Sequence, residues 1–138
     1  MDIVWSSILA LISSVAFSII ANVPRRALTG SAITGLVAWI VYYSLNTNNI
    51  GLAIPNFAAG IIIGVLGTYL ARKIKIPVTM IFIGSLISLV PGGMAFTTIQ
   101  NVSNTLDLIQ GLLNTLIVAM SLSLGIGSAS IFNKWLYR

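Results

Sequence analysis

The sequence predicts an all-α integral membrane protein with five transmembrane helices, its N-terminus outside the cell and its C-terminus inside. First, the 138 residues are 57% hydrophobic and only 7% charged. A soluble domain of this size is less apolar, because its exterior must face water. Second, apolar stretches recur along the chain, most of them close to the 20 or so residues that cross a bilayer as a helix. Third, the basic residues all follow the first, third or fifth stretch, whereas the acidic residues lie at the start of the first or the fifth.

The charge pattern predicts the orientation, because short cytoplasmic loops collect Lys and Arg. All seven basic residues fall on one side of a five-span topology, and both acidic residues fall on the other. The predicted inner side carries Arg25, Arg26, Arg72, Lys73, Lys75, Lys134 and Arg138, and the predicted outer side carries Asp2 and Asp107.

The first three spans are expected at about residues 3–21, 27–45 and 51–71, and their short linkers predict antiparallel neighbours within one transmembrane domain, residues 1–138. The first stretch reads as a retained span, because no basic residue precedes Arg25, whereas a signal peptide has a positively charged start. Aromatic residues near the span ends are expected as interfacial anchors, namely Trp5, Trp39, Tyr42, Tyr43, Trp135 and Tyr137.

The fourth span, about residues 76–95, is predicted to be broken at Pro91-Gly92-Gly93. The stretch from Ile76 to Val90 would extend about 22 Å as a helix, whereas the hydrocarbon layer is about 30 Å thick. The break is therefore expected inside the membrane. The alternative is an exit loop that ends the span early. The fifth span is expected at about residues 106–132.

Small residues follow one face of each span, and Gly60, Gly64 and Gly67 predict close helix packing. In the fifth span, Asp107, Gln110 and Asn114 form a polar ladder. Both a pathway-lining role and a position at the membrane interface stay open for this ladder.

The composition also argues against several classes of function. The chain has no Cys and no His, which removes thiol chemistry, the commonest metal ligand and the commonest general base. We therefore expect no enzyme, no metal site and no cofactor. The basic residues flank membrane spans without forming a stripe, so the lipid bilayer rather than nucleic acid is the expected partner.

Two segments resemble the threonine/serine exporter family. One is Asn22-Val23-Pro24-Arg25-Arg26, followed by Gly35 and Trp39. The other is Ile76-Pro77 with Leu89-Val90-Pro91-Gly92-Gly93. Ser88 departs from the pattern, because the family is expected to have Pro at this position.

The resemblance implies a secondary exporter of small amino acids such as threonine and serine, or of dicarboxylates such as succinate. It further implies the small subunit of a two-component exporter in a bacterial cell membrane. The partner would be a larger five-span subunit of opposite orientation with a hydrophilic N-terminal region, as in inverted-repeat transporters. The alternatives are a non-transporting assembly subunit and a homo-oligomeric channel.

The broken span is the expected solute site, because a helix that starts within the membrane presents free N–H groups to a carboxylate. The expected solute is small and anionic or zwitterionic. Candidate pathway residues are Ser88, Pro91, Gly92, Gly93, Asp107, Gln110 and Asn114. The cytoplasmic loop of Asn22, Pro24, Arg25 and Arg26 is expected to set topology, with one Arg also able to pair with a carboxylate of the partner chain.

Overall fold

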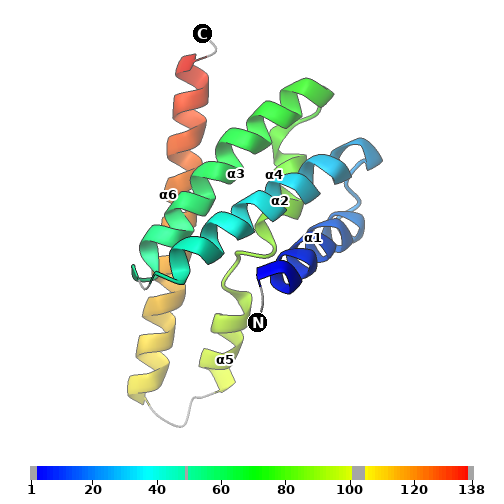
Figure 1. Ribbon diagram of the computed structural model, residues 1–138. Coiled ribbons are helices and arrows are strands. Elements are labelled where there is room, and N and C mark those ends of the chain that lie inside the picture. The colour runs from blue at the N-terminus through cyan, green and yellow to red at the C-terminus, as the bar shows by residue number, and fades with distance from the viewer. Residues whose placement is uncertain (1–2, 49, 101–104, 137–138) are drawn as a thin grey trace.

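The computed structural model describes residues 3–48, 50–100 and 105–136, and within these ranges the chain is entirely α-helical (Figure 1). The predicted helical fold class is therefore confirmed. The six helices are α1 (Ile3–Ile20), α2 (Arg25–Asn46), α3 (Ala53–Ile74), α4 (Val78–Leu86), α5 (Gly92–Gln100) and α6 (Thr105–Leu136).

Four helices of the described chain, α1, α2, α3 and α6, are long and apolar enough to cross a membrane. The predicted fourth span instead forms α4 and α5, of nine residues each. Each of them covers only about 14 Å at 1.5 Å per residue. In Figure 1 the chain nevertheless passes from one end of α3, through α4 and α5, to the opposite end of the molecule. The count of five spans and their orientation remain predictions.

The fourth span is broken earlier than predicted. Helix α4 ends at Leu86, and residues 87–91 form turns, while Gly92 and Gly93 belong to the first turn of α5. The cause is Pro91, whose ring would collide with the carbonyl of residue 87 in a continuous helix and which disfavours helical geometry at Val90. The N–H of Leu89 bonds to the carbonyl oxygen of Leu86, three residues earlier, at 2.9 Å, and the N–H of Val90 shares the same oxygen at 3.0 Å.

Two turns, between α1 and α2 and between α3 and α4, are built alike. Asn22 and Lys75 adopt the left-handed conformation, with φ of 56° and 59°. In both turns the N–H of the next residue bonds to the carbonyl five residues earlier, at 2.9 and 3.0 Å. Pro24 and Pro77 then cap the following helix. This is the Schellman ending followed by Pro, which closes one helix and starts the next within a few residues.

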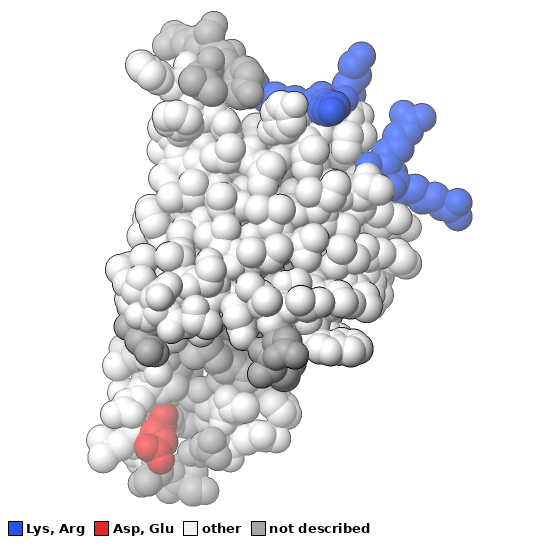
Figure 2. Space-filling model, viewed as in Figure 1, with Lys and Arg blue, Asp and Glu red and all other residues white. Residues whose placement is uncertain are grey.

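The charged side chains lie at opposite ends of the molecule. Figure 2 shows the Lys and Arg side chains gathered at one end and the acidic side chain at the other. Arg25 and Arg26 occupy the first turn of α2, where the helix dipole disfavours a positive charge. Helix stability therefore does not explain these two arginines. The role in setting membrane topology that the sequence suggests for them stays a prediction.

The apolar core lies between α2, α3, α6 and the break. Its buried cluster joins Ala38 of α2, Ala59 and Ile63 of α3, Leu89 of the break, and Val118 and Leu122 of α6. Among the described helices, α6 packs only on α3 and α5, and α5 packs only on α6. Helix α4 packs on α1, α2 and α3.

Glycines allow α3 to approach its neighbours closely. A β-carbon on Gly60 would lie 2.7 Å from the carbonyl oxygen of Leu122, and one on Gly64 would collide with the Ala129 side chain. A β-carbon on Gly67 would lie 2.6 Å from the Phe82 ring of α4. Small residues at these positions therefore bring the α3 backbone against α6 and the Phe82 side chain.

Candidate functional site

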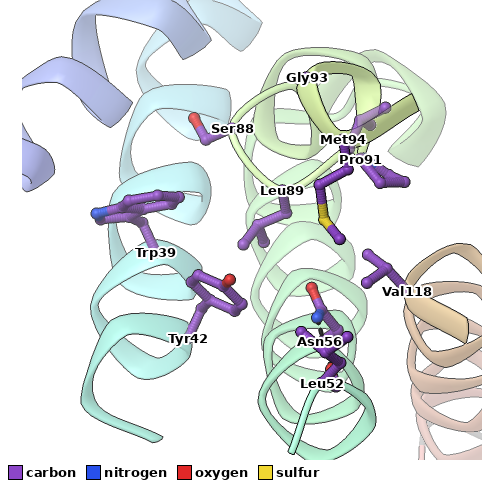
Figure 3. A pocket seen from close by; sticks show the side chains of 11 residues that line it. Trp39, Tyr42, Leu52, Asn56, Ser88, Leu89, Pro91, Gly93, Met94 and Val118 are labelled. Carbon is purple, nitrogen blue, oxygen red and sulfur yellow. Dashed lines mark hydrogen bonds between the residues drawn. The ribbon is translucent and has the colours of Figure 1, made fainter. Parts of the chain in front are cut away.

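A pocket of about 230 Å³ lies beside the break between α4 and α5 (Figure 3). Its walls come from four parts of the chain: the C-terminal half of α2, the start of α3, the break with the first turn of α5, and the middle of α6. The lining residues are Trp39, Tyr42, Leu52, Asn56, Ser88, Leu89, Val90, Pro91, Gly93, Met94 and Val118.

The walls from α2 and α3 combine aromatic rings with one amide. The rings of Trp39 and Tyr42 have centroids 5.4 Å apart. Asn56 is only 2% exposed, and its side-chain nitrogen donates to the carbonyl oxygen of Leu52 at 2.7 Å. Figure 3 shows its amide oxygen pointing toward Leu89 and Met94. Asn56 thus offers the pocket a hydrogen-bond acceptor whose orientation is fixed by the α3 backbone.

The break contributes backbone groups. Gly93 and Met94, in the first turn of α5, line the pocket. The first N–H groups of a helix have no partner within it and carry a partial positive charge. The break therefore places the weakly positive start of α5 beside the pocket.

The predicted site residues fall into two groups. Ser88, Pro91 and Gly93 line the pocket, while Gly92 is exposed beside it, and a β-carbon on Gly92 or Gly93 would meet no atom within 4 Å. The polar ladder of α6 lies outside this lining: Asp107 and Gln110 are exposed and Asn114 is half-buried. The loop residues Asn22, Pro24, Arg25 and Arg26 are exposed beside the basic end.

A family comparison identifies the kind of protein to which this site belongs. The family described as "Threonine/Serine exporter, ThrE" matches residues 6–132. The chain belongs to the threonine/serine exporter family. It is therefore a multi-pass membrane protein of the amino-acid exporter type, and the family is one of transporters rather than enzymes. No solved structure matches this exporter chain.

Ser88 ties the break of this exporter to α1. Its hydroxyl lies 2.9 Å from the hydroxyl of Ser13 and 3.2 Å from the carbonyl oxygen of Ala10. The Ser13 hydroxyl also donates to Ala10, at 2.9 Å. A proline, which the resemblance leads one to expect here, could make neither contact. In this exporter Ser88, within the break, therefore holds α1 by hydrogen bonds.

Sequence reasoning missed most of the lining residues, including the aromatic and amide side chains. Trp39 and Tyr42 were expected as interfacial anchors but form a pocket wall, whereas Trp5 and Trp135 are 65% and 79% exposed. Asn56 was not among the predicted site residues. The available signal was its polarity, since an amide within an apolar span is more often functional than a glycine or alanine is.

Proposed function

We propose that the chain is the small subunit of a secondary exporter for threonine, serine or similar small amino acids. A dicarboxylate such as succinate is the second candidate solute. The exporter would need a larger five-span subunit of opposite orientation with a hydrophilic N-terminal region. One observation carries the proposal: a chain of the exporter family has a pocket with polar groups at the interruption of a helix. Discontinuous helices form the solute sites of many transporters.

The chemistry of the pocket favours a zwitterion over a dianion. The N-terminal turn of α5 suits a carboxylate, and the amide oxygen of Asn56 suits an ammonium group. None of the described residues that line the pocket is charged. A dianion would therefore enter without a countercharge, at a high cost of desolvation, whereas an amino acid brings its own.

The proposed need for a partner rests on the exposed surface of α5. Helix α5 packs only on α6 among the described helices, and Phe96 and Ile99 on α5 are exposed. A partner subunit packed against α5 would close the pocket on that side. Within the same proposal, α4 and α5 together form the fourth span, since 18 helical residues cover about 27 Å. Asp107, Gln110 and Asn114 would line the outer approach to the pocket.

The test is efflux of radiolabelled threonine and succinate from proteoliposomes that hold this chain, its larger partner, or both. We expect threonine efflux only with both. Gly92→Leu should reduce efflux from the assembled complex at least tenfold by filling the space beside the pocket. Gly127→Leu is the matched control, because Gly127 is also exposed and has no neighbour within 4 Å of its β-carbon position.

Three outcomes would replace the proposal. Efflux by the partner alone would make this chain an assembly subunit. Efflux by this chain alone would indicate a homo-oligomeric carrier or channel. Equal efflux in the Gly92→Leu and Gly127→Leu complexes would indicate that the break is not part of the solute path.

A further inference from the structure

A second pocket lies on the other side of Trp39. It has a volume of about 300 Å³ and is lined by Ser6, Leu9, Ala10, Ser13, Trp39 and Ser88. It shares only Trp39 and Ser88 with the pocket at the break. The indole ring and the Ser88 side chain therefore form the partition between a cavity on the α1 side and a cavity on the α3 and α6 side.

The indole N–H of Trp39 is buried and has no hydrogen-bond partner. Figure 3 shows the indole nitrogen on the side of the ring away from Tyr42 and Asn56. Buried polar groups are paired with few exceptions, and leaving a donor unpaired destabilises the conformation that buries it. The observed position of the ring is thus disfavoured relative to one in which the N–H meets an acceptor.

The neighbouring hydroxyls do not supply that acceptor in this conformation. Ser13 and Ser88 lie against each other and against the carbonyl oxygen of Ala10. Both hydroxyl oxygens keep a lone pair that could accept a hydrogen bond, but neither oxygen is a hydrogen-bond partner of the indole N–H in this conformation. The indole ring of Trp39 lines both pockets, so each pocket offers space into which the ring could turn. A group that enters either cavity and accepts a hydrogen bond would stabilise the turned ring.

We propose that Trp39 is the gate between two successive solute positions, and that its indole turns to donate the N–H to the carboxylate of the passing solute. We assign a carboxylate as the acceptor, because a hydrogen bond to a charged group is stronger than one between neutral groups. The described lining of the α1-side pocket contains no charged residue. The solute must therefore carry its own positive charge, as an amino acid does. This inference rests on the proposed export function and deepens it.

The first test compares two ligands on two matched variants of the reconstituted exporter complex. Trp39→Phe keeps an aromatic wall and removes the N–H, and Trp5→Phe makes the same change at an exposed position. The ligands are L-threonine and L-threoninol, in which a hydroxymethyl group replaces the carboxylate. We expect Trp39→Phe to raise the Kd of threonine about tenfold or more and to leave that of threoninol within about twofold. Trp5→Phe should change neither.

A second measurement does not depend on replacing Trp39. The chain has three tryptophans, so Trp5→Phe with Trp135→Phe leaves Trp39 as its sole indole fluorophore. With the larger subunit also free of tryptophan, threonine should shift the emission of Trp39, and threoninol should shift it much less.

The outcomes separate this inference from the proposed function. If the wild-type complex neither binds nor exports threonine, the proposed export of threonine fails, and this inference fails with it. If the wild type does both and Trp39→Phe keeps its threonine Kd, Trp39 is no gate although the export function stands. Equal losses for threonine and threoninol would show that the ring only shapes the pocket. An emission spectrum that threonine leaves unchanged would also overturn the proposal.

Discussion

The contact between α3 and α6 should be the part of the fold most sensitive to a single methyl group. In Gly60→Ala, the new β-carbon would lie 2.7 Å from the carbonyl oxygen of Leu122 and 3.2 Å from the Cα of Gly125. Both distances are shorter than the 3.4 Å at which ordinary contact begins. The obstacles are backbone atoms, which cannot turn aside as a side chain can, so the two helices must separate.

The expected cost follows from that separation. A gap of about 0.5–1 Å forfeits about a quarter to a half of the dispersion energy between the atoms that it parts. Overpacking of a tight interior typically costs about 1–3 kcal/mol. We therefore expect Gly60→Ala to lower the free energy of unfolding by about 1–3 kcal/mol, despite the better helix propensity of alanine.

The measurement is reversible unfolding in mixed micelles, followed by far-ultraviolet circular dichroism. Gly127→Ala is the control, because it makes the same chemical change where a β-carbon meets nothing within 4 Å. It should leave the free energy of unfolding unchanged or raise it by up to about 1 kcal/mol. Equal unfolding midpoints for the two variants would refute the reasoning that backbone contact at Gly60 holds α3 to α6.

Four further predictions concern topology, stability and transport. A cysteine at Asn48 should react with an impermeant thiol reagent added outside intact cells and one at Lys73 should not, and the reverse pattern would invert the orientation. Gly92→Ala should keep the stability of the parent, since its β-carbon meets no atom within 4 Å, and a loss above about 1 kcal/mol in unfolding experiments would contradict this. Asp107→Asn should leave threonine affinity unchanged, because Asp107 is outside the lining of the pocket; a several-fold change in Kd would place it at the bound solute instead of on the outer approach. Arg25→Lys or Arg26→Lys should slow export if one of these guanidinium groups pairs bidentately with a partner carboxylate, and normal export by both variants would leave only the topological role.

The helical class and the approximate positions of the long helices could be predicted from the sequence. Apolar length and charge placement dominate these features. The Schellman turn at Asn22 was within reach too, because Asn tolerates the left-handed conformation and Pro24 suits the start of the next helix. The end of α4 at Leu86 could not be predicted in the same way. Pro91 disrupts the helix up to four residues before it, whereas the Pro-Gly-Gly pattern predicts a break at Pro91 and the glycines after it.

The pocket shows the limit of reading one helix at a time. Ser88, Pro91 and Gly93 carry local signals and were predicted as site residues. Trp39 and Tyr42 line the pocket only because α2 crosses beside the break, and their types fit an interfacial anchor equally well. Whether an aromatic residue faces lipid or a cavity depends on which neighbour packs against its helix, and the spacing within that helix does not specify the neighbour.

The isolation of α5 bears on how the pocket opens. Among the described helices α5 packs only on α6, where Thr98 lies against Gly111. Within a bilayer α5 is expected to stay helical, because unwound backbone groups would find no water to bond to. A change at the contact with α6 would therefore move α5 as a rigid helix. Such a movement would open one wall of the pocket while α1 to α4 stay packed, so the proposed solute site could be exposed without movement of the whole bundle.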